Sequence, residues 1–140
     1  MAEIIYLYKG DKIDSTNKEP RWLGIDDLKL FNEHLVLCGQ RPLGFEMWNK
    51  VYAEGTMYCL MLEAGLPVAR ACVEKYSEEK WEVADVRVAK EYRNRGLAYE
   101  VSIFVLNYII ENGKQPTIRT EEHNIPMQHV ISKIGFEILE

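Results

Sequence analysis

A short polar segment in the second half of the sequence carries its clearest chemical pattern. The segment consists of Arg93, Asn94, Arg95, Gly96, Leu97 and Ala98. It lies between a strand predicted over 81–89 and a helix predicted over 97–112. The first amide groups of a helix lack intrahelical acceptors and carry partial positive charge. Because glycine lets a phosphate approach these amides and arginine adds donors for its oxygens, the segment predicts a pyrophosphate site.

The segment has a purely structural alternative and two functional ones that can be excluded. It could be a solvated basic turn in which glycine serves only the tight backbone geometry. It is not a P-loop, because the Gly-Lys-Ser/Thr ending is missing. It is not a dinucleotide-binding fingerprint either, because it contains a single glycine.

Two motifs of the sequence resemble those of the GNAT acyltransferases. The stretch 88–98 is similar to their motif A, which reads Arg/Gln-x-x-Gly-x-Gly/Ala after a strand. Downstream, Asn124 precedes a predicted helix that ends in Lys-Ile-Gly-Phe at 133–136, which resembles their later signature. The order of predicted elements also agrees. The resemblance covers most of the chain and is most specific over 81–136.

The resemblance implies a cofactor and a reaction. The co-substrate would be acetyl-CoA, and the acceptor a primary amine of a small molecule or peptide that attacks the thioester directly. The sheet of such proteins splays at this strand, so backbone groups of Val86, Arg87 and Val88 would bind the pantetheine arm. Asn124 would contact the cofactor near its thiol end and is a candidate catalytic residue. From the residue alone, Asn124 could equally be a helix-start cap.

Glu82 is the candidate general base. It shares the strand alternation of Val86 and Val88, and its spacing from the Arg-x-x-Gly turn resembles that of the glutamate used by the histone-acetylating GNAT branch. The alternative is a surface carboxylate on a half-exposed strand. Asp85, on the opposite parity of the strand, is a competitor.

Further candidates for proton transfer lie downstream. Glu121 and Glu122 follow the fifth predicted strand. Another GNAT branch places its base five residues before the asparagine, but Arg119 occupies that position here. His123 is a further candidate, although a loop histidine is more often simply solvated.

The usual proton donor of the family is missing. Ile131 stands where these proteins often have a tyrosine, five residues before the phenylalanine of Gly-Phe. Tyr99, Tyr92, His129 or solvent could serve instead, or the thiolate could leave unaided. The departure favours one rival hypothesis, an acyl-CoA-binding regulatory module without turnover. A second rival is an interaction domain without any CoA site.

The remaining pattern predicts the elements that must position these residues. Strands are expected at 3–8, 57–63, 68–75, 81–89, 117–120 and 136–139, and helices at 28–38, 45–53, 97–112 and 125–134. The stretch 9–21 is polar and predicts a loop. The order β-α-α-β-β-β-α-β-α-β indicates an α+β fold, with a mixed, mostly antiparallel central sheet flanked by helices. We expect one GNAT-like domain over 1–140.

Composition limits the possible partners. The 140 residues include 17 basic and 22 acidic side chains, and the net charge of −5 argues against a general nucleic-acid binder. No apolar run is long enough to span a membrane. The three cysteines are odd in number and widely spaced, so neither a disulfide framework nor a metal site is expected. Buried free thiols suit a reducing cytoplasm, which is the predicted location.

Two expectations concern the outer parts of the fold. Phe45, Trp48, Tyr52 and Tyr58 could be ordinary core, as their spacing suggests, or could line an acceptor pocket. The last predicted strand is short compared with the family, so its edge could be open or completed by another subunit. Because proteins usually cover an unpaired edge, a homodimer is predicted.

Overall fold

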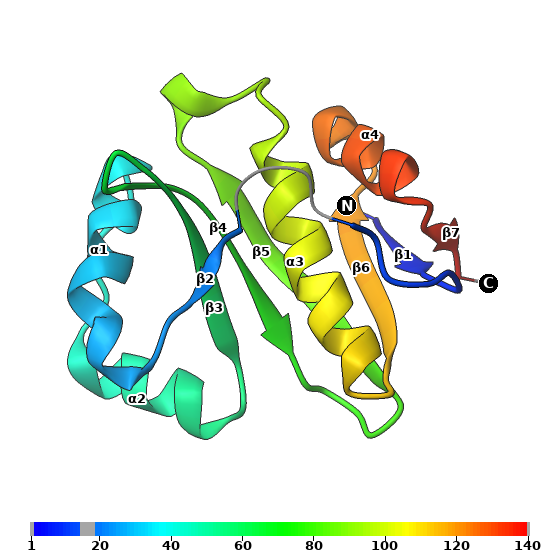
Figure 1. Cartoon of the computed structure of the whole chain (residues 1–140), viewed down its shortest axis with the longest axis horizontal. Helices are drawn as coiled ribbons and strands as arrows, with labels where there is room; N and C mark the ends of the chain where they lie inside the picture. The colour runs from blue at the N-terminus through cyan, green and yellow to red at the C-terminus, as the bar shows by residue number, and fades with distance from the viewer. Residues whose placement is uncertain (1, 15–18, 140) are drawn as a thin grey trace.

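One mixed sheet with helices on both faces forms the framework of the computed structural model, which describes residues 2–14 and 19–139 (Figure 1). The spatial order of its strands is β2-β3-β4-β5-β6-β1-β7. The strands are β1 (Glu3–Leu7), β2 (Arg21–Trp22), β3 (Met57–Glu63), β4 (Leu66–Glu74), β5 (Lys80–Val88), β6 (Gln115–Glu121) and β7 (Glu137–Ile138). The helices are α1 (Leu28–Leu37), α2 (Phe45–Ala53), α3 (Leu97–Glu111) and α4 (Ile125–Ile134). The predicted α+β fold class is confirmed.

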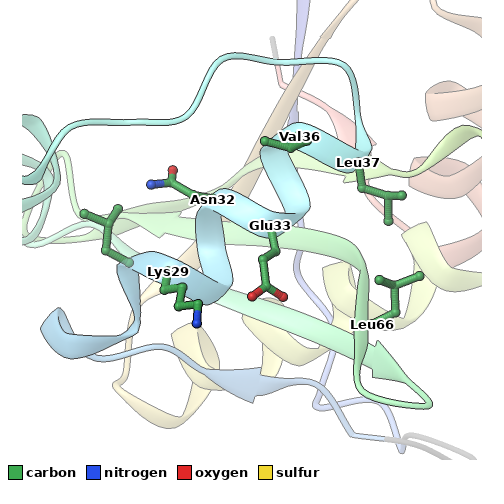
Figure 2. A pocket seen from close by; sticks show the side chains of 7 residues that line it. Lys29, Asn32, Glu33, Val36, Leu37 and Leu66 are labelled. Atoms are coloured by element: carbon green, nitrogen blue, oxygen red, sulfur yellow. The ribbon is translucent and has the colours of Figure 1, made fainter.

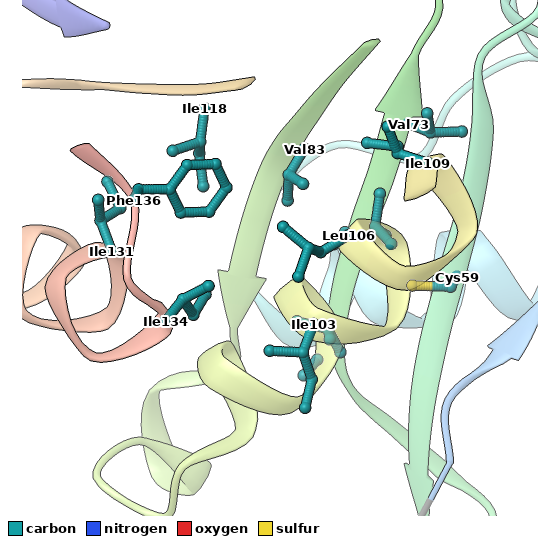
Figure 3. Close-up of a cluster of buried hydrophobic side chains, with 14 of the residues drawn as sticks. Cys59, Val73, Val83, Ile103, Leu106, Ile109, Ile118, Ile131, Ile134 and Phe136 are labelled. Atoms are coloured by element: carbon teal, nitrogen blue, oxygen red, sulfur yellow. The ribbon is translucent and has the colours of Figure 1, made fainter. Parts of the chain in front are cut away.

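Alternating residues of strand β3 show how the helices are divided between the two faces. Cys59 and Met61 belong to the core cluster that also contains α3 and α4 side chains, whereas Leu60 packs with residues of α1 and α2. Since successive side chains of a strand point to opposite faces, α3 and α4 cover one face and α1 and α2 the other. Figure 3 shows part of the first cluster, where Leu106 of α3 and Ile134 of α4 approach the sheet.

The strand pairing creates a split at the centre of the sheet. Strands β3, β4 and β5 form the predicted antiparallel meander. Strand β5 pairs with β6 in parallel, but the pairing runs only from Lys80 opposite Gln115 to Val83 opposite Ile118. Beyond Val83, β5 stays paired with β4 alone. The second half of β5 therefore has an unpaired edge that faces away from β4.

A bulge in β5 places Glu82 on the sheet face opposite to the one that the strand alternation predicted. The register with β4 shifts after Cys72 opposite Ala84, and Asp85 takes a left-handed backbone conformation with φ of 47°. Val83 packs in the α3-side core, so Glu82 points to the opposite face of the sheet. Val86 also packs toward α3, because the extra residue reverses the alternation. The expectation that Glu82 shares a face with Val86 and Val88 is wrong.

Two further differences lie in the outer strands. The predicted loop over 9–21 ends in a short strand, β2, which pairs antiparallel with β3 through Arg21 and Trp22. Residues 15–18 of that loop lie outside the described part of the chain. At the other edge, β7 pairs with β1, and Ile138 is 64% exposed. The homodimer expected from this edge stays a prediction. Among the described residues, no helix is both long and apolar enough to cross a bilayer.

Asn107 of α3 fastens the segment that leaves β1. Its side-chain amide donates to the carbonyl of Ile13 at 2.7 Å, and its Oδ1 accepts from the Ile13 amide at 2.9 Å. The pair closes a contact between positions 94 residues apart in sequence. Because both groups are partly buried, losing the side chain leaves a backbone donor and acceptor without their partner.

We expect the Asn107→Ala variant to lower the free energy of unfolding by about 2 kcal/mol, as measured by urea denaturation. The matched control is Asn112→Ala, because the Asn112 side chain makes one exposed bond to the Tyr108 carbonyl. The control should lose less than about 0.5 kcal/mol. Equal losses in the two variants would contradict the fastening role of Asn107.

Candidate functional site

A cavity of about 600 Å³ lies between the end of β5, the first turn of α3 and helix α4. Its lining contains most of the residues that the sequence predicted for the cofactor, namely Val86, Arg87, Val88, Arg93, Asn94, Gly96, Leu97, Ala98 and Asn124. Residues far apart in sequence therefore meet at one place. We call this space the α3–α4 cavity.

The first backbone amides of α3 follow a sharp turn and have no acceptor within the helix. Asn94 and Gly96 both have positive φ, 65° and 80°, which turns the chain sharply before Leu97. No atom lies within 4 Å of the place where a Gly96 Cβ would be. The N-cap residue of α3 is Gly96, which has no side chain that could cap these amides. Free amides at the positive end of a helix dipole, with open space beside them, fit a pyrophosphate group.

The basic residues of the turn have different surroundings. Arg93 lines the cavity, and its Nε donates to the Val88 carbonyl at 3.2 Å. Arg95 is outside the lining: its guanidinium lies over the Tyr92 ring at 5.1 Å and 3.8 Å from a Glu63 carboxylate oxygen. It contributes positive charge near the turn from a distance.

Lys133 of α4 is a cavity residue that the sequence did not assign to the site. It belongs to the Lys-Ile-Gly-Phe signature, and its ammonium lies 4.3 Å from the centre of the Tyr99 ring. The signature could have indicated it, but only the packing of α4 beside α3 places this charge opposite the basic turn.

Asn124 has the capping role that was one of its two interpretations. Its Oδ1 accepts a hydrogen bond from the Met127 amide at 3.2 Å at the start of α4. The same residue lines the α3–α4 cavity and a second cavity described below. The cap bond restricts the orientation of the Asn124 side chain. Its contact with the cofactor stays a prediction.

A second cavity of about 710 Å³ opens at the split between β5 and β6. It is lined by Glu3, Asp85, Thr120, Glu121, His123, Asn124 and Pro126. Three of these side chains are carboxylates, and His123 lies 3.1 Å from a Glu121 oxygen. Because Asn124 and Pro126 line both cavities, the two spaces adjoin. We call this space the acidic cavity.

Glu82 lies on the sheet face opposite α3, but it is buried rather than half-exposed. Only 5% of the residue is accessible, and both carboxylate oxygens accept from the Arg119 Nε at 2.9 and 3.1 Å. This contact raises the pKa of Arg119 above its ordinary value, chiefly through the hydrogen bond and then through the opposite charge. The Thr117 hydroxyl lies 3.5 Å from the same carboxylate.

Glu74 is a candidate proton carrier that the sequence analysis missed. It lies directly opposite Glu82 in the β4–β5 pair. Burial and, next, the charge of Glu82 raise the pKa of its carboxyl above the ordinary value. The predicted meander could have indicated this pairing, but its register could not be read from the sequence.

The candidate proton donors lie on one side of the split, and His123, the other candidate for a catalytic role, lies across it. Tyr92, Tyr99 and His129 all line the α3–α4 cavity, whereas His123 lines the acidic cavity. Ile131 is buried in the core and offers no hydroxyl. At this position, where the family often has a tyrosine, the chain therefore has an apolar side chain that packs in the core.

The aromatic residues of the first helices are mostly core. Trp48, Tyr52 and Tyr58 pack in the α1–α2 cluster, and the Trp48 indole donates to the Ile25 carbonyl at 2.8 Å. Phe45 is 61% exposed and lines none of the three cavities described. Figure 2 shows a third cavity beside α1, which includes Leu66 and shares no lining residue with the other two.

A buried polar group links α1 to strand β5. Arg70 of β4 is 2% exposed, and its guanidinium makes two hydrogen bonds of 3.1 Å to the two oxygens of Asp85. Its remaining arm donates to Gln40 Oε1 at 2.9 Å and lies 3.3 Å from His34 Nδ1. Since arginine can only donate, His34 must present an unprotonated Nδ1. Burial, and then the charge of Arg70, lower the His34 pKa to about 4.

Comparison with known proteins agrees with this geometry. The family model of the FR47-like proteins matches residues 67–140, more than half of the chain. The chain belongs to the FR47-like family, which is related to the GNAT acetyltransferases. No curated protein matches the sequence significantly.

Solved structures of GNAT proteins share the fold. A protein assigned to the GNAT family from Novosphingobium aromaticivorans matches with a TM-score of 0.78 and 19% identity, over 99% of this chain and 60% of its own. A GNAT acetyltransferase from Colwellia psychrerythraea matches with 0.77 and 16%, over 97% and 52%. AAC(6')-Iy, solved with the bisubstrate analogue CoA-S-monomethyl-acetylneamine, matches with 0.74 and 15%, over 89% and 94%. The chain thus spans little more than half of the first two proteins.

The lowered His34 pKa predicts a pH dependence of stability. The unfolded chain binds this proton near pH 6.5 and the folded chain only near pH 4, so stability falls as pH decreases through that window. The loss attributable to His34 should reach at most about 3 kcal/mol. Urea denaturation between pH 7 and 4 should show a shallower slope for His34→Gln than for the unchanged chain.

The control for this prediction is His129→Gln, because His129 is an exposed histidine of α4. It should keep the slope of the unchanged chain. An identical slope in the His34→Gln variant would show that His34 is not buried in its neutral form.

Proposed function

We propose that the chain is an acetyl-CoA-dependent N-acetyltransferase that acts on a primary amine of a small molecule or peptide. The observation that carries the proposal is the junction of two cavities at the split between β5 and β6. One has the first amides of α3 and basic side chains, which suit a pyrophosphate. The other is rich in carboxylates, which suit an ammonium group. An amine and a thioester can meet where the cavities adjoin.

In this proposal, the α3 turn, helix α4 and strand β5 each bind a different part of acetyl-CoA. When bound, acetyl-CoA supplies the acetyl group and a thiol leaving group. The α3 turn, with Arg93 and Lys133, holds the pyrophosphate, and the free edge of β5 pairs with the pantetheine arm. The amide of Val86 or Val88 donates to the thioester carbonyl oxygen and stabilises the charge that develops there. Asn124 contacts the cofactor near the sulfur.

The acceptor side must deliver a neutral amine. Glu82 is the proposed proton acceptor, although its ion pair with Arg119 holds both carboxylate oxygens. Glu74, whose raised pKa makes it a better proton acceptor than an ordinary surface carboxylate, is the second candidate. A proton could reach either group through water from the acidic cavity. The amine then attacks directly, without an acyl-enzyme.

The acceptor class follows from charge and from the structural neighbours. Glu3 and Glu121 line one cavity together with Asp85, which Arg70 already pairs, and the excess of carboxylates in this lining favours a cationic small molecule over an anionic one. AAC(6')-Iy, which shares the fold, was solved with the bisubstrate analogue CoA-S-monomethyl-acetylneamine. A small-molecule amine is therefore our first choice, and a peptide amine our second. A cytoplasmic location stays a prediction.

The rival proposal is an acyl-CoA-binding module without turnover. Ile131 favours it, because the position of the usual proton donor is buried and apolar. The presence of Tyr92, Tyr99 and His129 in the α3–α4 cavity favours turnover, because each could protonate the departing thiolate. Release of free thiol in the presence of an amine panel separates the two.

Calorimetry with acetyl-CoA tests the cofactor site. The Arg93→Ala/Arg95→Ala variant should bind acetyl-CoA about tenfold or more weakly, because it loses charge-assisted contacts to phosphate. The control is Arg21→Ala, since Arg21 pairs with Asp27 in an exposed position outside both cavities. It should bind as the unchanged chain does. No heat of binding at millimolar acetyl-CoA with the unchanged chain would refute the proposal.

The pH dependence of turnover tests the base. The Glu82→Gln variant should lose kcat most at low pH, where the neutral amine is scarce, by about a hundredfold. Glu74→Gln is the matched comparison, because the two carboxylates face each other across β4 and β5. If only Glu74→Gln changes the pH–rate profile, the base is Glu74. If neither variant changes it, both assignments are wrong.

A further inference from the structure

The left-handed residue of strand β5 is held by a buried arginine from the neighbouring strand. We propose that Arg70 is a positioning residue for the cofactor strand: by clamping the Asp85 carboxylate, it holds the bulge that turns Val86 and Val88 toward the α3–α4 cavity. The inference rests on the proposed acetyl-CoA site for its affinity test, and on the backbone of β5 for a second test that needs no cofactor.

The contact between Arg70 and Asp85 has the geometry of a clamp. Nε and Nη2 of Arg70 each donate to a different oxygen of Asp85, both at 3.1 Å. A planar guanidinium bound through two parallel hydrogen bonds fixes both the position and the orientation of the carboxylate. The Tyr58 hydroxyl adds a third bond to the same carboxylate at 2.8 Å. Three donors thus determine where the Asp85 side chain lies.

The backbone at Asp85 needs such support. Its φ of 47° is in the left-handed region, which is sterically unfavourable for a residue with a Cβ. The register of β5 against β4 shifts at the same place. Without a contact that favours it, the extended strand alternation would compete with the bulge.

The bulge decides which residues face the cofactor. With Asp85 inserted, Val86 and Val88 pack toward α3 and line the α3–α4 cavity, while Asp85 points to the opposite face and meets Arg70. A regular strand would reverse these orientations, because side chains alternate along it. The backbone groups that must bind the pantetheine arm would then change place as well.

Residues on the face of the sheet that α1 covers hold Arg70 in place. Gln40 and His34 contact its third nitrogen, and the Phe31 ring lies 5.8 Å from its central carbon. His34 and Phe31 belong to α1, which covers the face opposite α3. The clamp therefore connects α1, on one face, to the strand that lines the cofactor cavity on the other.

The experiment compares substitutions that separate charge from backbone conformation. Arg70→Met keeps an unbranched apolar stem but removes the guanidinium and with it the clamp, and Asp85, whose side chain is 38% exposed, can still reach water. Arg70→Met/Asp85→Gly places a residue that adopts positive φ freely, without needing the clamp. Arg70→Met/Asp85→Ala also lacks the carboxylate but disfavours positive φ. The two double variants differ by one methyl group.

Acetyl-CoA affinity by calorimetry is the first readout, with folding checked by circular dichroism. Arg70→Met should bind about tenfold more weakly. The glycine double variant should recover to within about threefold of the unchanged chain, and the alanine double variant should not. Arg21→Met is the control for loss of an ion-paired arginine elsewhere and should bind normally. Because glycine at position 85 also relieves the left-handed strain and so raises stability, affinities are compared only among variants that circular dichroism shows to be folded.

The second readout is the intraresidue amide–Hα NOE at position 85, which is strong when φ is positive. It should be strong in the unchanged chain and weaker in Arg70→Met and in the alanine double variant, whereas the glycine variant is compared by affinity because one of its two Hα atoms is close to the amide at either sign of φ. If Arg70→Met is folded and keeps both affinity and NOE, the clamp has no positioning role. If glycine and alanine behave alike, the inference is equally wrong. If the unchanged chain binds no acetyl-CoA, the proposed function fails, and the NOE alone decides the clamp.

Discussion

The structure depends on one ion pair between neighbouring strands, in which the arginine is buried and the aspartate is partly exposed. Arg70 of β4 binds both oxygens of Asp85 in β5, at the residue where β5 leaves the regular strand conformation. A buried guanidinium is costly to desolvate unless all its donors are used. Here Gln40 and His34 contact a further nitrogen of the guanidinium, and His34 brings helix α1 into the arrangement. The chain thereby stabilises a distorted strand in the middle of its sheet.

The distortion lies next to the split that makes the site possible. Strand β6 stops pairing with β5 after Val83, two residues before Asp85. The free edge of β5 then offers backbone groups to a ligand, as an edge strand does to any extended partner. Helix α3 begins on one side of this edge with amides that have no acceptor within the helix, and carboxylates line the cavity at the other. Opposite charge preferences on the two sides suit a reaction between a phosphorylated donor and a cationic acceptor.

Patterns of local origin were predictable. The bounds of α2, β3 and α4 follow from apolar periodicity and from the glycines and prolines beside them, and the structure has them where they were expected. The turn before α3 was recognisable because its residue types suit anion binding by themselves. In contrast, β2 was missed, because a two-residue strand is defined by its partner β3 and has no period of its own. The register that places Glu74 opposite Glu82 could not be predicted either, because it is set by the pairing of two strands and not by a local pattern.

The sequence by itself determined the order of the elements other than β2, the α+β class and the basic turn at 93–98, because each depends on residues close together in the chain. Only the tertiary structure decided which way Glu82 and Val86 point. A single inserted residue reverses every side chain after it, and Asp85 takes that conformation in contact with Arg70, 15 positions away. Likewise, the pairing of Glu82 with Arg119 depends on a parallel neighbour 37 residues distant. Such contacts come from the packing of strands, which no local pattern encodes.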